Sequence, residues 1–127
     1  MKKLLVVLLL GVMTGSCGLL DSGSDTVAVS ATLSGVLIEN NTSETIYHTA
    51  FSKRILPLID WIPCTVPDDC PGVAPEHYKV LRYADIEAYS ENDTVVVYWW
   101  NLQKIDDGYK VVNLERAMVD TRFYVKL

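Results

Sequence analysis

The sequence predicts an all-β protein, an antiparallel β-sandwich of about seven short strands behind an N-terminal leader. Three observations favour this class. Runs rich in Val, Ile, Thr and aromatic residues recur along the chain, turn-forming residues separate them, and no segment has an unambiguous helical period. The length behind the leader suits a single sandwich domain, which we expect at residues 27–127.

The first 16 residues have the composition of an export signal. Lys2 and Lys3 give a positive start, residues 4–13 are an apolar run broken only by Gly11, and small residues follow. A helix that spans a bilayer needs roughly twenty apolar residues. We therefore expect a cleaved signal peptide at 1–16 and not a membrane helix.

The small residues lead into Cys17, and the sequence Thr14-Gly15-Ser16-Cys17 resembles the lipobox of bacterial lipoproteins. The resemblance implies that the Cys17 sulfur carries a lipid, that the mature chain starts there and that the protein belongs to the bacterial cell envelope. Gly18 in the next position implies the outer membrane or its periplasmic face in a Gram-negative cell. Thr14 departs from the usual leucine, and an ordinary secretory signal is the alternative.

The segment 17–26 and the charge of the chain bear on its partners. Gly, Ser and Asp are frequent in 18–26, which predicts a flexible tether between the lipidated cysteine and the folded domain.

The chain has 11 basic and 16 acidic residues, and removal of 1–16 takes two lysines with it. An acidic domain does not neutralise phosphates or attract anionic lipids. We expect no nucleic-acid partner and a membrane contact made by the lipid on Cys17.

Prolines and cysteines crowd residues 57–71. With Cys17 assigned to lipid, Cys64 and Cys70 form an even remainder, and an exported protein sits where disulfides persist. The short turn between them brings the two within bonding reach. We predict a Cys64–Cys70 disulfide that staples a crossover between the two halves of the domain, with Trp61 filling the sandwich.

The first half of the domain alternates apolar and polar residues with a period of two. Residues 27–31 begin the pattern, 36–38 continue it after a turn, and 45–52 repeat it with β-branched and aromatic residues. The connection at 40–44 is short and rich in Asn. It predicts an antiparallel hairpin between the strands on either side.

The second half contains one ambiguous stretch and one strongly apolar one. Residues 75–89 fit either a helix that starts at Pro75 or two short strands with a bend near Ala84-Asp85, and we prefer the strands. The run Thr-Val-Val-Val-Tyr-Trp-Trp at 94–100 is the most apolar behind the leader. It predicts the central strand of the core.

The C-terminal part predicts a hairpin and a last strand. Asp106-Asp107-Gly108 suits a tight turn, because Asp-Gly readily takes positive φ angles, and 109–112 pairs back on the preceding strand. The polar residues 113–117 interrupt the pattern before a final alternation at 118–127.

Four features together resemble small bacterial lipoproteins that carry one immunoglobulin-like domain. They are the lipobox, Asn-Asn-Thr at 40–42, Asp-Trp-Ile-Pro-Cys at 60–64 and Val-Tyr-Trp-Trp at 97–100. The resemblance implies an immunoglobulin-like strand order, although no cysteine pair is spaced to bridge the two sheets. Most such proteins have no known activity, so the resemblance implies no catalytic residue.

Residues that carry chemistry form no known catalytic pattern. The chain has no Gly-x-Ser-x-Gly, His-Glu-x-x-His or glycine-rich phosphate loop. A zinc site would have to add His48 and His77 to the two cysteines, and a calcium site would use the acids around Asp68; neither spacing matches a familiar site. We expect no enzyme activity, no cofactor and no metal.

The loop closed by the predicted disulfide is one candidate binding site. Short closed loops lose little entropy on binding, and protease inhibitors of several folds use this property. The candidate recognition loop consists of Thr65, Val66, Pro67, Asp68 and Asp69.

An aromatic strip is the second candidate. Tyr98 and Trp100 share a face of their strand, and Tyr47 and Tyr109 on neighbouring strands would extend it into a flat surface for sugar rings or a partner protein. Core packing explains the same residues without a ligand, and both interpretations stay open.

These observations predict a membrane-anchored, non-enzymatic lipoprotein whose sandwich has a structural or protein-interaction role in the envelope. The alternative is a binding module for an exogenous polysaccharide or protease, which would use the aromatic face or the loop 64–70.

Overall fold

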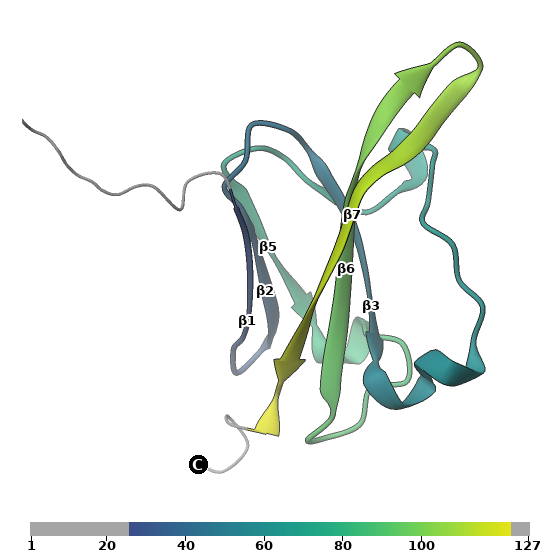
Figure 1. Cartoon of the computed structure of the whole chain (residues 1–127). Coiled ribbons are helices and arrows are strands. Elements are labelled where there is room, and N and C mark those ends of the chain that lie inside the picture. The colour runs from purple at the N-terminus through teal and green to yellow at the C-terminus, as the bar shows by residue number, and fades with distance from the viewer. Residues whose placement is uncertain (1–25, 123–127) are drawn as a thin grey trace, which may run out of the picture.

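Seven strands and three short 3₁₀ helices make up residues 26–122, the part of the chain that this computed structural model describes (Figure 1). The predicted signal peptide, Cys17, residues 18–25 of the tether and the last five residues of the chain lie outside the described residues. Within the described part, no helix has the length and apolar character needed to cross a membrane.

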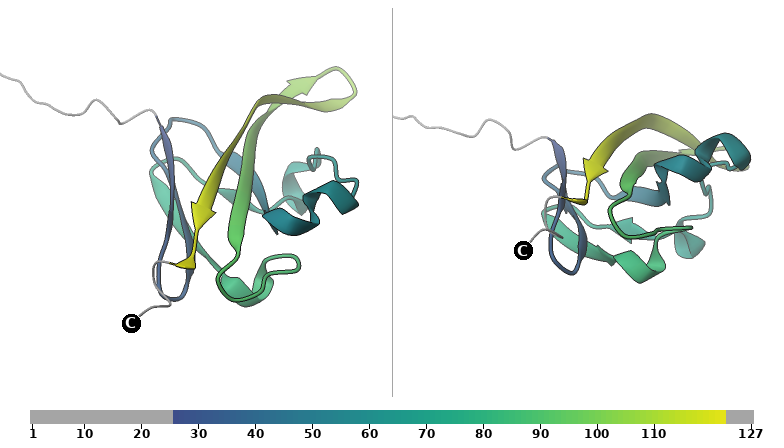
Figure 2. Two further views of the ribbon diagram at one scale, coloured as in Figure 1. Left: turned by 60° about the horizontal axis from the view of Figure 1, so that its bottom comes forward. Right: turned by 90° about the horizontal axis from the view of Figure 1, so that it is seen from below.

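The strands form two antiparallel sheets, ordered β1-β2-β5 and β4-β3-β6-β7 (Figures 1 and 2). In an immunoglobulin-like sandwich the first, second and fifth strands likewise share one sheet, and the third, sixth and seventh share the other. The two antiparallel sheets confirm the predicted fold class, although β4 here joins the sheet of β3, β6 and β7. The strands are β1 Val27–Ala31, β2 Gly35–Asn40, β3 Ile46–Ser52, β4 Gly72–Val73, β5 His77–Arg82, β6 Thr94–Ile105 and β7 Gly108–Asp120. The 3₁₀ helices are η3 Lys53–Leu58, η4 Pro67–Asp69 and η5 Tyr83–Asp85.

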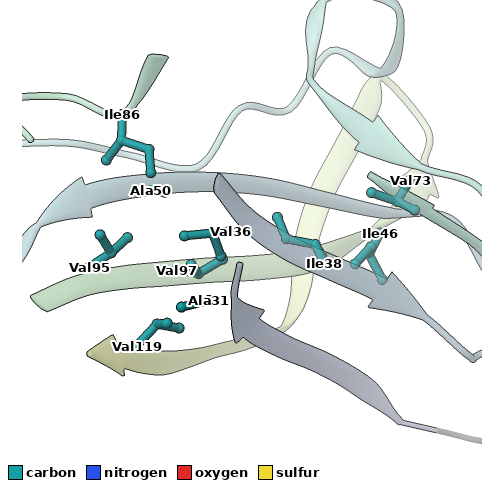
Figure 3. Packing of buried hydrophobic residues seen from close by; sticks show 10 residues of the cluster. All are labelled: Ala31, Val36, Ile38, Ile46, Ala50, Val73, Ile86, Val95, Val97 and Val119. Carbon is teal, nitrogen blue, oxygen red and sulfur yellow. The ribbon is translucent and has the colours of Figure 1, made fainter. Parts of the chain in front are cut away.

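Small and β-branched side chains fill the space between the sheets (Figure 3). Alternate residues of β3 are buried, as the period of two predicts. β6 lies between β3 and β7 and supplies Val95 and Val97, so the apolar run at 94–100 is the central strand that we expected. The buried cluster consists of Ala31, Val36, Ile38, Ile46, Ala50, Val73, Ile86, Val95, Val97 and Val119.

The predicted hairpin across residues 40–44 is wrong. β2 pairs with β1 and β5, whereas β3 pairs with β4 and β6, so the connection crosses from one sheet to the other. The side chain of Asn40 is fully buried and directs this crossing. Its Nδ2 donates to the carbonyl oxygens of Glu44 at 2.8 Å and Val73 at 2.9 Å, and its Oδ1 accepts from the Thr42 backbone N–H at 3.0 Å.

The ambiguous stretch 75–89 contains one strand instead of two. β5 ends at Arg82, and η5 makes the bend that we placed near Ala84-Asp85. Beyond it, only an isolated bridge between Glu87 and Phe51 joins the chain to β3. The second strand is missing because Ile86 turns inward as a core residue and the chain leaves the sheet edge after Glu87.

The hairpin at Asp106-Asp107 is confirmed, since Ile105 pairs with Gly108 and Gly108 has a φ of +144°. The polar residues 113–117 do not separate two strands, because β7 extends from Gly108 to Asp120, with a shift in its pairing to β6 opposite Trp99 to Asn101. These polar residues lie on an edge strand that solvent reaches, so they need not be apolar to be paired. The tip of the β6–β7 hairpin extends beyond the body of the sandwich (Figures 1 and 2).

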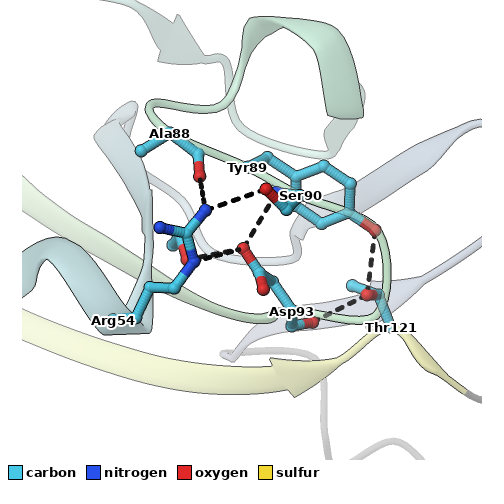
Figure 4. Close-up of polar contacts among 7 residues, drawn as sticks. Arg54, Ala88, Tyr89, Ser90, Asp93 and Thr121 are labelled. Atoms are coloured by element: carbon cyan, nitrogen blue, oxygen red, sulfur yellow. Dashed lines mark hydrogen bonds and ion pairs between the residues drawn. The ribbon is translucent and has the colours of Figure 1, made fainter.

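A polar network ties the chain after β3 to the turn before β6 and to the end of β7 (Figure 4). The Arg54 guanidinium lies 3.4 Å from the Asp93 carboxylate, which also accepts from the Ser52 hydroxyl at 2.8 Å. Thr121 donates its hydroxyl to the Asp93 carbonyl at 2.7 Å. Desolvation opposes ionisation, but the bonds from Ser52, the Ser90 backbone and Arg54 outweigh it and lower the pKa of Asp93.

Candidate functional site

The prediction that residues 57–71 cross between the two halves of the domain is wrong. They belong to the connection 53–71 between β3 and β4, which are antiparallel neighbours in one sheet. We keep the name crossover for residues 53–71, which lie against the outer face of the β4-β3-β6-β7 sheet. Trp61 is the contact, because its ring centroid lies 4.5 Å from that of Tyr98, 5.5 Å from that of Phe51 and 6.2 Å from that of Trp100. Phe51 and Tyr98 alternate with core residues along their strands and therefore face outward. Trp61 thus covers the outside of the sheet and does not fill the sandwich as we expected.

A disulfide closes the distal part of the crossover. Cys64 and Cys70 are bonded, with their Cα atoms 5.7 Å apart, which confirms the predicted pair. The indole Nε1 of Trp100 donates to the Cys64 carbonyl oxygen at 3.0 Å, and η4 forms a turn inside the loop. Two tryptophans, one disulfide and four prolines therefore restrict the conformations open to the crossover.

The four residues of the predicted aromatic face do not form one exposed surface. Trp100 is only 1 % exposed, so it cannot present its ring to a ligand. Tyr47 and Tyr98 are partly buried on the same outer face, Tyr98 beneath Trp61. Tyr109 lies apart on the β6–β7 hairpin, with the Lys104 Nζ 5.2 Å from its ring centroid. Packing of the crossover accounts for Trp100 and Tyr98.

Three large apolar side chains of the crossover point into solvent. Leu58 is 81 % exposed, Ile62 is 85 % exposed and Val66 is 52 % exposed. We call these three residues the crossover surface. Only Val66 belongs to the predicted recognition loop. Sequence reasoning missed Leu58 and Ile62, although they share a four-residue spacing with Val66 in a proline-rich segment that suits neither a strand nor a helix.

The other residues of the recognition loop carry no recognisable chemistry of their own. Thr65, Asp68 and Asp69 are exposed, and Pro67 is partly buried at the start of η4. Among the residues that the structure describes, no group of three or more His, Cys, Asp or Glu side chains is placed to hold a metal ion.

His48 is buried on the inward face of β3, between the two sheets. It is only 2 % exposed, and its Nε2 has no hydrogen-bond partner. Burial, with a smaller contribution from the charge of Lys79, lowers the pKa of His48 to about 4. The residue borders a cleft of about 440 Å³ between β3 and β5, lined also by the charged side chains of Lys79, Arg82, Asp85 and Glu87. Its Nε2 is itself closed to solvent.

The fold places the chain in the class of immunoglobulin-like β-sandwiches. No protein-family model matches the sequence, and comparison with curated proteins and with solved structures found no relative.

Proposed function

We propose that this chain is a membrane-anchored, non-enzymatic lipoprotein of the bacterial cell envelope, and that its crossover surface binds a partner protein. The observation that carries the proposal is the exposure of Leu58 and Ile62, 81 % and 85 %, on a segment with little freedom to move. The anchor rests on the lipobox resemblance at Cys17.

Rigidity is what distinguishes these side chains from scattered surface leucines. A flexible loop loses conformational entropy when a partner orders it, whereas a constrained loop has already lost it. The disulfide and the bond from Trp100 to the Cys64 carbonyl constrain this loop in the free protein. Burial of each apolar side chain by a partner contributes about 2 kcal/mol.

Charge has a smaller part in this contact. Asp68 and Asp69 are exposed beside Val66, so the rim of the surface is acidic. A partner with apolar pockets and a basic rim would match it, and the charges would mainly raise the association rate.

Site-directed photocrosslinking in intact envelopes tests the proposal. A photoreactive phenylalanine at position 62 should give one discrete crosslinked protein, because the partner covers Ile62. The matched control carries the same group at position 33, since Leu33 is also highly exposed, at 72 %, but lies on the β1–β2 turn. Ile62→Ser combined with Leu58→Ser should weaken binding of the crosslinked partner by about tenfold or more. Equal crosslinking from both positions, or none from position 62, would overturn the proposal.

A further inference from the structure

A cavity of about 640 Å³ opens where the start of β1, the β2–β3 connection and the base of the β6–β7 hairpin meet. Trp99 and Ile46 form part of its wall, and Glu44, Glu115, Asn101 and Asn113 supply polar groups. Trp99 packs against the core cluster, on the opposite face of β6 from Trp100. The cavity is therefore separate from the crossover surface.

An irregularity in the β6–β7 pairing builds one side of this cavity. Trp99 pairs with Glu115, but the next pair is Asn101 with Val112, so β7 has one residue more than β6 at this point. Within this bulge Asn113 has a φ of +57°, in the left-handed region. Bulges of this kind redirect a side chain, and Asn tolerates the left-handed backbone better than most residues.

Hydrogen bonds fix the two amides that the bulge brings together. Asn113 Nδ2 donates to Asn101 Oδ1 at 3.0 Å, and Asn101 Nδ2 donates to the Thr45 carbonyl oxygen at 3.0 Å. The amides are thus oriented before any ligand arrives, which reduces the entropy that binding would cost.

The walls of the cavity differ in chemistry. Trp99 and Ile46 are apolar, whereas the carboxylates of Glu44 and Glu115 and the amide of Asn113 are hydrogen-bonding groups. Among the described residues that line the cavity, none is Lys or Arg. A pyranose ring has a matching character, because one face presents C–H groups and its rim presents hydroxyls that donate to carboxylates. An anionic sugar would be repelled.

We propose that this cavity binds a neutral pyranose unit of an oligosaccharide. The C–H face of the sugar lies against Trp99, and its hydroxyls bond Glu115, Glu44 and Asn113. The volume falls within the range of small-molecule sites. The site neither needs the crossover surface nor depends on the partner proposed for it.

Indole N–H resonances give a direct test, because the chain has three tryptophans. Titration with cellotetraose, mannotetraose and chitotetraose should shift the Trp99 indole signal with at least one of them, with a dissociation constant of about 1 mM or tighter. The Trp61 and Trp100 signals should stay in place. A cationic chitosan tetramer is titrated in parallel. No Trp99 shift with any of the three neutral sugars, or a shift with the chitosan tetramer alone, would overturn the proposal.

The Asn113→Gly variant tests the role of the Asn113 amide in binding without disturbing the fold. Glycine accepts the left-handed backbone without strain, so the bulge persists while the amide is lost. Sugar binding should weaken by about tenfold. The matched control is Asn92→Gly, since Asn92 has a φ of +72° in a turn remote from the cavity, and it should bind as the wild type does. Unchanged binding in a folded Asn113→Gly variant would contradict the assignment.

Discussion

Among the described residues, the Nε2 of His48 is the only buried side-chain nitrogen or oxygen without a hydrogen-bond partner. The histidine occupies a core position between Ile46 and Ala50, where its ring packs as an apolar side chain would. A charged imidazolium there would have neither water nor an anion beside its Nε2, and for that reason the ring stays neutral.

This environment makes the stability of the fold depend on pH. The folded-state pKa of His48 is about 4 and its ordinary value is 6.5. As the pH falls between these values, the unfolded chain takes up a proton that the folded chain does not. The free energy of unfolding should therefore fall, by about 3 kcal/mol over the whole window, whereas above pH 6.5 the residue has no effect.

Urea unfolding at a series of pH values measures this slope. His48→Leu should remove the contribution, and the difference between variant and wild type isolates it from the carboxylates that titrate in the same range. His77→Gln, at the exposed second histidine, is the control and should leave the slope intact. A His48→Leu slope identical to that of the wild type would show the prediction to be wrong.

Asn40 marks the limit of sequence reasoning at the level of single residues. In the sequence, Asn at the end of an alternating run indicates a turn, and the chain does turn after Asn40. Its buried side chain bonds Val73, 33 positions away. A contact with so distant a residue has no signature in the local sequence pattern. For that reason the prediction that the strands before and after 40–44 pair as a hairpin was wrong.

At the level of elements, the crossover owes its position to Trp61. Its ring packs against those of Phe51, Tyr98 and Trp100. The sequence predicted the disulfide, because once Cys17 is assigned to lipid, Cys64 and Cys70 are the remaining pair in a chain that we expect to be exported. It did not predict the face that the segment covers, since both faces of β6 are apolar in sequence.

Trp61→Ala should release the crossover while the sandwich stays folded. Loss of the aromatic contacts should cost about 2 kcal/mol, because Trp61 is only partly buried. The Trp100 indole N–H, bonded to the Cys64 carbonyl, should then exchange with solvent about tenfold faster or more.

Hydrogen exchange followed by NMR provides the readout. The backbone amide of Val97, in β6 between Ala50 of β3 and Ala117 of β7, should keep its protection, which distinguishes local release from global unfolding. Tyr109→Ala removes an aromatic ring from the β6–β7 hairpin and should leave Trp100 unaffected. Unchanged exchange at Trp100 in Trp61→Ala would mean that the disulfide alone positions the crossover.

At the level of the whole molecule, the membrane anchor stays a prediction from the sequence. Cys17→Ser should abolish incorporation of radioactive palmitate and release the protein from the membrane fraction, because no other lipid attachment is predicted. Labelling of cells followed by fractionation measures both. Cys64→Ser with Cys70→Ser is the control and should keep the label. Retained label in Cys17→Ser would rule out the lipobox assignment.

The fold class could be predicted from the sequence because it depends on features that short stretches carry. Alternation along residues 27–31 and 45–52, the valines at 95–97 and the Asp-Asp-Gly turn each indicate strands and turns without knowledge of the rest. The candidate sites depend instead on which segments, distant in the sequence, the fold brings together. Leu58 and Ile62 look like ordinary apolar residues in the sequence, and the cavity beside Trp99 requires the bulge at Asn113, which no local pattern indicates.

The outer edge of β7 could pair with a second copy of the chain. β7 ends the order β4-β3-β6-β7, so its outer edge has no paired strand among the described residues. It is 13 residues long and exposes Leu114 and Met118, features that favour edge-to-edge pairing between copies and aggregation. Glu115 and Arg116, in the polar run 113–117, place charges in the C-terminal half of β7, and pairing between copies would have to desolvate them. These charges therefore disfavour edge-to-edge pairing of β7 between copies.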